Sequence, residues 1–492
     1  MSPDTVAGLP PLPADRPAFS GRWLTAAQDM APFLTDWRRR WSGSAIAVAQ
    51  PEGTADVAAI VRWCVRHRIA VVPQGGNTGL SGGSVPDASG RAVVLSLARM
   101  TRVRAIDPDN DTLTLEAGCT LLQAQEAAAG AGRLLPLSLA AEGSCTIGGN
   151  LATNAGGVQV LRYGNARELC LGLEVVLPDG QVWDGLRGLR KDNTGYDLRD
   201  LFIGSEGTLG VITAAVFKLY PQPAERANAW VAVPDAAAAT ALLRLARAHA
   251  GDGLTAFELI SHTCLGLVLR HMPGTRSPLG AASPWYVLLE LAAPASAAPP
   301  AQTLEHLLEQ AFADGLASDA AVAASGAQFD ALWALRENIS EAQAAEGKTI
   351  KHDIALPISA IAGFVEETGE AIAQQFPAAR QVVFGHLGDG NLHYNLSPAE
   401  GVHAADAAAQ AAFLADEPAL NRLVHDAVAR RGGSISAEHG LGVLRRDEAA
   451  RYKSAAERSL MQAVKRAIDP LGLFNPGKLL PGPQGVAAEA AP

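Results

Sequence analysis

Two histidines and one glutamate in the last third of the chain have the residue types of a metal site. His386 and His393 lie near the two ends of the segment GHLGDGNLH, and Glu438 follows in SAEHG. Two imidazoles and one carboxylate form a common ligand set for a divalent metal that keeps a coordination position open. This donor set suits zinc and is also compatible with manganese or iron, so the residues alone leave the metal open.

Local structure must bring these three side chains together. The Gly-Asp-Gly-Asn run between the histidines is typical of a tight turn, so flanking strands would form a hairpin with both imidazoles on one side. A short strand at 434–436 would then deliver Glu438. Two orientations are possible for His439. In an extended segment its side chain would point to the face opposite Glu438, whereas a sharp turn at Gly440 would change that direction.

Far upstream, three Gly-rich segments are also rich in Asn, Thr and Ser: 73–83, 143–157 and 203–213. The first follows a predicted strand at 71–73, as phosphate-binding loops often do. Successive glycines allow backbone N–H groups to converge on an anion without interference from Cβ atoms. This first segment fits neither G-x-G-x-x-G nor G-x-x-x-x-G-K-[ST], which excludes the Rossmann and P-loop interpretations. Together the three segments indicate a dinucleotide site of another kind.

The three segments, together with Arg162-Tyr163-Gly164 and RKDNTGYD at 190–197, resemble the FAD-linked oxidases of the vanillyl-alcohol oxidase type. The GHLGDGNLH and EHG segments resemble the branch that acts on D-2-hydroxy acids. That branch includes dehydrogenases of D-2-hydroxyglutarate, which this chain resembles most, dehydrogenases of D-lactate, and the flavoprotein subunit of glycolate oxidase. The resemblance extends from about residue 45 to about residue 480, which is nearly the whole chain.

The resemblance implies an α+β chain with a PCMH-type FAD-binding domain of two α/β subdomains. An α/β substrate domain with an antiparallel sheet and a C-terminal helical segment would follow. Pro221-Gln222-Pro223 has the composition of a linker, and residues 21–41 are expected to form helix with a Pro break. The expected ranges are 1–44 for an N-terminal lead and helix, 45–222 for FAD, 223–400 for substrate, and 401–492 for the segment that returns to the FAD.

By the same resemblance, FAD would be held by residues of the three loops and the tail. One position also bears on attachment: some relatives bind FAD covalently through a histidine of the first loop, where this chain has Asn77. An amide cannot form that bond, so we expect non-covalent FAD. The residues implied are Gly75, Gly76, Asn77, Thr78, Gly79, Leu80, Ser144, Thr146, Gly149, Asn150, Thr153, Asn154, Gly157, Glu206, Ile212 and Asn475.

The metal would then serve an oxidation. A 2-hydroxy acid would bind the metal at His386, His393 and Glu438 through its hydroxyl and one carboxylate oxygen, which acidifies the hydroxyl. The family match implies two roles for His439: it is the base that removes the hydroxyl proton, and it contacts the substrate. The Cα hydrogen would leave as hydride to the flavin, and the reduced flavin would pass its electrons onward.

A further set of residues bears on which acid is oxidised. Arg336 and Ser340 are four apart in a helix predicted over 333–340 and thus on one face, and Lys351 lies in a predicted strand. Arginine can bind a carboxylate through two hydrogen bonds, and lysine adds a point charge. The D-2-hydroxyglutarate branch carries Arg, Thr and Lys here, and Asn395 matches another of its substrate contacts. Donors for two carboxylates favour D-2-hydroxyglutarate, with D-malate as a second substrate, and Ser340 and Lys351 would bind the distal carboxylate.

Composition limits the remaining classes. The net charge of −10 argues against general nucleic-acid binding. The N-terminus lacks the features of a signal or transit peptide, and no apolar run approaches about 18 residues. No C-x-x-C pair suggests an iron–sulfur cluster or zinc ribbon, and an odd, scattered count fits free thiols in a reducing cytosol. The cysteines are Cys64, Cys119, Cys145, Cys170 and Cys264.

We therefore expect a cytoplasmic protein without a membrane span, whose electron acceptor is a soluble carrier such as an electron-transfer flavoprotein. The sequence leaves the oligomeric state open and is compatible with a homodimer. Three alternatives stay open at this stage. They are a D-lactate dehydrogenase with the same flavin and metal, a flavin-free metallohydrolase that uses His386, His393 and Glu438, and a flavoprotein that only binds a partner.

Overall fold

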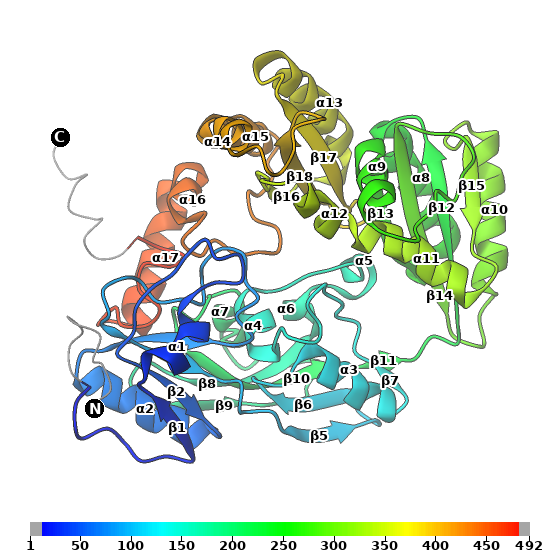
Figure 1. The fold of residues 1–492 in the computed structure, drawn as a ribbon. Coiled ribbons are helices and arrows are strands. Elements are labelled where there is room, and N and C mark those ends of the chain that lie inside the picture. Colours follow the sequence, from blue (N-terminus) through cyan, green and yellow to red (C-terminus); the bar gives the residue numbers. More distant parts are fainter. Residues whose placement is uncertain (1–11, 482–492) are drawn as a thin grey trace. The chain divides into compact units, whose positions relative to one another are not determined.

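A computed structural model describes residues 12–481 (Figure 1). These residues form two compact units, and the division after Pro221 lies close to the predicted linker. The first unit contains the described residues up to Gly156, then Gly164–Pro221, then those from Glu438 on. The second contains Gly157–Tyr163 and Gln222–Ala437, so residues 401–437 belong with the second unit and only the later part of the C-terminal segment joins the first.

Two sheets form the frame of the first unit. One has the order β1-β2-β4-β3, with β2, β4 and β3 parallel and β1 antiparallel at the edge; the other is antiparallel, with the order β5-β6-β10-β8-β9. Every residue of β2 and β4 is buried, as expected for parallel strands covered on both faces. The strands are β1 (Gly21–Leu24), β2 (Ala47–Pro51), β3 (Ala70–Gln74), β4 (Ala92–Ser96), β5 (Val103–Asp107), β6 (Thr112–Glu116), β8 (Cys170–Val176), β9 (Val182–Gly185) and β10 (Val211–Lys218), with a separate pair β7 (Arg133–Leu134) and β11 (Tyr220–Pro221).

The five cysteines of the chain, in both units, are free thiols and all are buried.

Helix α2 supplies much of the apolar core of the first unit, because one face carries Val57, Ile60, Val61 and Cys64, all fully buried. The helices of the unit are α1 (Ala27–Leu34), α2 (Thr54–Arg66), α3 (Leu121–Gly130), α4 (Ile147–Ala152), α6 (Ala166–Leu169), α7 (Arg199–Phe202), α16 (Arg446–Tyr452) and α17 (Ala455–Ile468).

The predicted helix over 21–41 is present only at Ala27–Leu34 and is wrong before and after that range. Gly21–Leu24 is strand β1, which pairs antiparallel with β2, and the helix is limited to α1, which contains Pro32. Pairing with a strand about 26 residues away overrides the local pattern here, and such pairing is invisible to helical spacing. Residues 1–11 of the predicted lead lie outside the described part of the chain.

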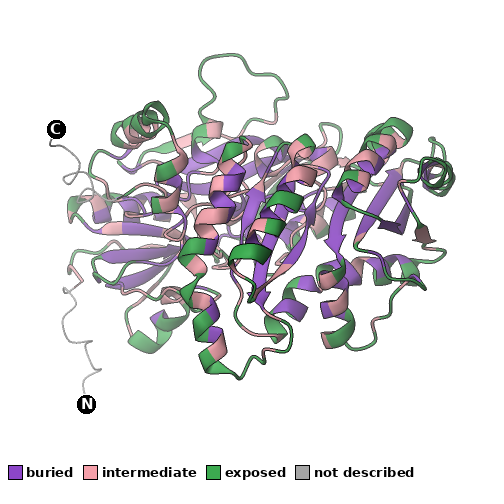
Figure 2. Ribbon diagram, turned by 90° about the horizontal axis from the view of Figure 1, so that it is seen from above, coloured by how far each residue is buried: buried purple, intermediate pink, exposed green. Residues whose placement is uncertain are grey.

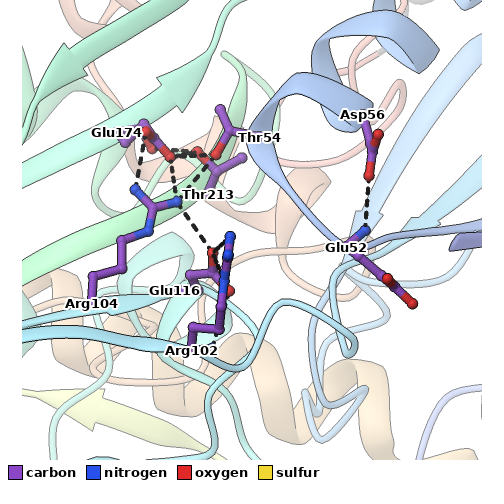
Figure 3. A network of polar contacts seen from close by, with 8 residues as sticks. All are labelled: Glu52, Thr54, Asp56, Arg102, Arg104, Glu116, Glu174 and Thr213. Carbon is purple, nitrogen blue, oxygen red and sulfur yellow. Dashed lines mark hydrogen bonds and ion pairs between the residues drawn. The ribbon is translucent and has the colours of Figure 1, made fainter. Parts of the chain in front are cut away.

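A polar network ties α2 to the five-stranded sheet (Figure 3). The Arg104 guanidinium lies 3.1 Å from Glu174 Oε1 and 3.4 Å from Glu116 Oε1, while Thr54 and Thr213 donate to Glu174 Oε1 at 2.5 and 2.7 Å. Burial opposes the charged form of Glu174, but these hydrogen bonds outweigh it and lower its pKa. Because Thr54 is the first residue of α2, the network fixes the start of that helix.

The second unit is built on a seven-stranded antiparallel sheet, in agreement with the predicted substrate domain. Its order is β15-β12-β14-β13-β17-β18-β16, and its central strands are buried along most of their length. Figure 2 shows helices of the molecule that are buried on one side and exposed on the other. The strands are β12 (Glu225–Val233), β13 (Leu254–Ser261), β14 (Trp285–Ala293), β15 (Asp319–Val322), β16 (Asp353–Ala355), β17 (Ala379–His386) and β18 (Asn391–Pro398).

The helices of this unit pack against the sheet through apolar faces. They are α5 (Val160–Tyr163), α8 (Ala236–Ala250), α9 (His262–His271), α10 (Pro300–Ala313), α11 (Gly326–Glu337), α12 (Ile339–Ala345), α13 (Ile358–Gln375), α14 (Ala407–Ala415) and α15 (Glu417–Arg430), with a 3₁₀ turn at Gly251–Gly253. Within residues 12–481, no helix is long and apolar enough to cross a membrane.

Candidate active site

A cavity in the first unit is lined by all three Gly-rich segments. Within these segments, the wall also includes Gln74, Ser81 and Ser205, for which no role was predicted, and outside them it includes His439. Of the residues predicted to hold the cofactor, the wall contains Gly75, Gly76, Asn77, Thr78, Gly79, Thr146, Gly149, Asn150, Thr153, Glu206 and Ile212. The other five, Leu80, Ser144, Asn154, Gly157 and Asn475, are not among its lining residues.

The backbone of the first segment is packed too closely for side chains. A Cβ at Gly75 would overlap the Thr146 hydroxyl, and a Cβ at Gly76 would overlap the carbonyl oxygen of Ser144. The Thr146 Oγ1 atom is buried and has no hydrogen-bond partner among the described residues. A buried hydroxyl without a partner beside close-packed glycine backbone fits a bound polar group such as a phosphate, which accepts from hydroxyl and N–H donors.

Two asparagines of these segments have positive φ, a conformation that asparagine tolerates better than most residues. Asn77, with φ +54°, donates to the carbonyl of Thr35 at 2.9 Å and accepts from the Ser84 hydroxyl at 2.7 Å. Asn154, with φ +51°, accepts from the backbone N–H of Arg167 at 3.0 Å. Both amides are therefore engaged in holding the shape of the loops.

The tail returns to the cavity segments through Asn475. Its backbone N–H donates to the carbonyl of Val71 at 2.8 Å, and its side-chain amide donates to the carbonyls of Gly83 and Glu206 at 2.8 and 2.7 Å. The Asn475 Oδ1 atom is buried without a partner in the described part of the chain. The tail thus joins the first and third segments.

His439 lies on a loop that the same two segments hold. The Ser81 hydroxyl donates to the carbonyls of His439 and Gly440, at 3.3 and 3.2 Å. The Glu206 carboxylate accepts from the backbone N–H groups of Leu441 and Gly442, at 2.7 and 2.8 Å. Burial raises the pKa of Glu206 and these two hydrogen bonds oppose the rise. Gly440 has φ +71°, so of the two alternatives considered for this segment the sharp turn is the one present.

The two histidines of the GHLGDGNLH segment share one face of the second unit's sheet. His386 ends β17 and His393 lies in β18, and the two strands form the predicted hairpin. Phe384 pairs directly with His393, and His386, two residues further on, projects to the same side. The two imidazole centroids are 5.8 Å apart.

Glu438 follows Ala437, the last residue of the second unit, whose backbone N–H donates to the carbonyl of Asp353 at 3.2 Å. One peptide bond therefore holds Glu438 close to β16, next to the histidine strands. Its carboxylate and the nitrogens of His386 and His393 lie within 4.8 Å of one another. These three donors fit a divalent metal. The predicted strand at 434–436 is wrong: only Ser434 forms a bridge, to Ala355, and the chain bends at 437–439.

Arg336 is buried against the same face. Its Nε donates to Glu258 Oε2 at 2.7 Å, and its guanidinium lies 4.7 Å from the centre of the Phe384 ring. Glu258 Oε1 is 2.6 Å from His386 Nδ1. Burial opposes ionisation of Glu258, but His386 and Arg336 outweigh it and lower its pKa to about 2. No described residue accepts a hydrogen bond from the two terminal nitrogens of Arg336.

The remaining predicted substrate residues lie on separate elements. Asn395, buried in β18, donates to Gln343 Oε1 at 3.0 Å, and Lys351 is half-buried just before β16. Ser340 is exposed, and the helix predicted to carry Arg336 and Ser340, residues 333–340, is present except at Asn338. That helix is broken between α11 and α12 at Asn338, so Arg336 and Ser340 do not share one regular face.

Sequence reasoning missed two buried polar residues of this region. Glu258 stands alone in the apolar strand LTAFELIS, and a lone acid in such a strand is a signal that a buried partner must exist. Gln343 bonds both Asn395 and Ser397, and it had no signal in the sequence because it lies in an Ala-rich helix that looks solvent-exposed.

Two family models match the chain. The model described as FAD binding domain matches residues 45–185, and that described as FAD linked oxidases, C-terminal domain matches residues 222–479. The chain is 41% identical to D-2-hydroxyglutarate dehydrogenase, mitochondrial, of Bos taurus, over 97% of this chain and 85% of the relative. It is 40% identical to D-2-hydroxyglutarate dehydrogenase of Xanthomonas citri pv. viticola, with coverage of 93% and 94%.

A relative from Schizosaccharomyces pombe, with the provisional name of a mitochondrial D-lactate dehydrogenase, is 37% identical over 92% of this chain and 85% of its own length. Among solved structures, p-cresol methylhydroxylase with substrate bound superimposes with a TM-score of 0.71 at 16% identity, covering 93% of each chain. This likeness shows the fold, and it confirms the PCMH-type arrangement predicted for the chain.

Proposed function

Because the chain belongs to the family of FAD-linked oxidases, we propose that it is an FAD-dependent dehydrogenase that oxidises D-2-hydroxyglutarate to 2-oxoglutarate. D-Malate is a second substrate under this proposal. The observation that carries the substrate assignment is Arg336, whose guanidinium is fixed through Nε beside His386 and keeps its terminal nitrogens for a carboxylate. The names of the bovine and Xanthomonas relatives support the same substrate.

The chemistry divides between residues of the chain and two bound groups. The three Gly-rich segments and the tail would hold FAD, which would supply a hydride acceptor. His386, His393 and Glu438 would hold a divalent metal, for which zinc is the first choice, and the metal would supply a Lewis acid.

The chain's own residues bind the acid and move its proton. Arg336, with Ser340, Lys351 and Asn395, binds and orients the carboxylates. His439 accepts the hydroxyl proton as the Cα–H bond breaks, so that one proton and one hydride leave together and a C=O bond forms. Reoxidation of the flavin falls to a soluble carrier such as an electron-transfer flavoprotein.

The test of the proposal is anaerobic reduction of the bound flavin by a panel of D- and L-2-hydroxy acids, with and without a chelator. D-2-Hydroxyglutarate should bleach the flavin with the highest kcat/KM, and the chelator should stop it. Preference for D-lactate would instead identify the protein as a D-lactate dehydrogenase, the alternative that the provisional name of the S. pombe relative favours. A colourless folded protein would indicate a metallohydrolase, and no reduction by any acid would indicate a partner-binding flavoprotein.

Lys351→Ala should lower kcat/KM for D-2-hydroxyglutarate about 10–100-fold more than for D-lactate, because a charged hydrogen bond contributes about 1.5–3 kcal/mol and D-lactate lacks the distal carboxylate. Steady-state kinetics with both acids measure this ratio. Lys348→Ala, which removes an exposed lysine three residues away, is the matched control and should change neither value. An equal loss on both acids in Lys351→Ala would reject the distal assignment.

The attachment of FAD is tested separately. Asn77 lines the cavity where relatives with covalent FAD carry histidine, and its amide already bonds Thr35 and Ser84. After acid precipitation the yellow chromophore should be in the supernatant, with the mass of free FAD. Colour that stays with the precipitated protein would contradict this prediction.

A further inference from the structure

Glu258 is a carboxylate that the proposed mechanism does not use. It lies in the middle of β13 and is fully buried. Burying a charged carboxylate is costly unless its oxygens are paired. Both oxygens are paired here, and each has a different partner: Oε1 is 2.6 Å from His386 Nδ1, and Oε2 accepts from Arg336 Nε at 2.7 Å.

The two partners come from different elements and have different proposed tasks. Strand pairing sets Glu258 directly opposite His386, which is a proposed metal ligand. Helix α11 carries Arg336, the proposed carboxylate clamp, to the other oxygen. One side chain therefore touches both halves of the proposed substrate site, at hydrogen-bond distance in each case.

Each hydrogen bond fixes an orientation that the chemistry needs. A carboxylate that accepts from Nδ1–H sets the tautomer of His386, so that a metal would bind at Nε2. The bond from Arg336 Nε holds the plane of the guanidinium and occupies Nε, which leaves the terminal nitrogens as the donors for a second carboxylate. Contact with the Phe384 ring restricts the same plane further.

We propose that Glu258 is a positioning residue that holds the metal ligand His386 and the substrate-binding Arg336 at fixed positions relative to each other. Metal affinity and dicarboxylate recognition then depend on one buried side chain. This inference rests on the proposed function, and it adds a residue that neither the motifs nor the proposed mechanism include. The competing explanation is a buried ion pair that serves only the stability of the second unit.

Glu258→Gln tests it because an NH₂ group, which cannot accept a hydrogen bond, replaces one of the two oxygens, so one of the two partners faces a donor. The Kd for Zn²⁺, measured on metal-depleted FAD-containing protein by competition with a coloured chelator, should rise roughly 10–100-fold. The KM for D-2-hydroxyglutarate should rise in the same variant at saturating Zn²⁺. Arg336→Lys, which leaves the contact between Glu258 and His386 in place, should raise that KM and leave the Kd for Zn²⁺ close to that of the wild type.

Glu290→Gln is the matched control. Glu290 lies in β14 on the same face of the sheet, is also buried, and is also bonded to α11, through Trp333 Nε1 at 2.9 Å. A thermal melt of each variant compares stability. If Glu258→Gln does not fold, Glu258→Asp is the second variant, because it keeps the charge but is one methylene shorter. It should raise both the Kd for Zn²⁺ and the KM for D-2-hydroxyglutarate, to a smaller extent.

The outcomes separate the two proposals. A wild type that binds no Zn²⁺ and is not reduced by D-2-hydroxyglutarate would overturn the proposed function. A wild type that does both, with Glu258 variants that lose thermal stability but match Glu290→Gln in Kd for Zn²⁺ and in KM, would overturn the positioning role alone. A rise in both the Kd for Zn²⁺ and the KM, absent from the control, supports it.

Discussion

Replacing His439 by asparagine is expected to slow flavin reduction by D-2-hydroxyglutarate about 10²–10⁴-fold, because a positioned general base contributes that factor and an amide cannot take the proton. His439 lines the cavity formed by the Gly-rich segments, and Ser81 and Glu206 hold its loop through backbone hydrogen bonds. The variant should still contain FAD and metal, so the loss should fall on kcat. Rapid mixing under anaerobic conditions measures the rate of reduction directly.

The control for this variant is His306→Asn, which changes an exposed histidine of α10 and should leave the rate unaltered. Flavin and metal contents are measured on both proteins before the kinetics. A His439→Asn protein that keeps both groups and reduces its flavin at the wild-type rate would reject the role as base. Loss of flavin from this variant would instead assign His439 to cofactor binding.

His393→Ala is expected to abolish metal binding and to lower kcat/KM by more than about 100-fold, since even residues that only support a metal ligand cost 10–100-fold when removed. The flavin should stay bound, because the Gly-rich segments belong to the first unit and His393 lies in β18 of the second. Metal analysis, the flavin spectrum and reduction by D-2-hydroxyglutarate report the three properties separately.

Two comparisons sharpen this result. His249→Ala removes an exposed histidine of α8 in the same unit and should change nothing. Treating the wild type with a chelator should reproduce the defect, and adding back zinc, manganese or iron one at a time should show which metal restores activity. A His393→Ala protein with full metal content and full activity would remove His393 from the ligand set.

Local sequence patterns anticipated the parts of the site that local rules control. A Gly-Asp-Gly-Asn run between two histidines predicted a hairpin with both imidazoles on one side, and β17 and β18 form it. Clustered glycines predicted loops in which backbone approaches closely, and Gly75 and Gly76 are packed without room for a Cβ. In each case the residues that determine the geometry are neighbours in the chain.

Predictions failed where contacts between distant residues decide the geometry. Gly21–Leu24 is a strand because β2 pairs with it. Apolar spacing reports which face of an element is buried, but it carries no information about which other element will cover that face.

By itself, then, the sequence determined the family, the glycine loops, and the hairpin of His386 and His393. Only the tertiary structure decided that Glu258 lies against both His386 and Arg336, and that Glu206 holds the loop of His439. Glu258 is separated from His386 by 128 positions and from Arg336 by 78. Such contacts depend on the order and register of strands in a sheet, which the whole chain sets through its non-local pairings.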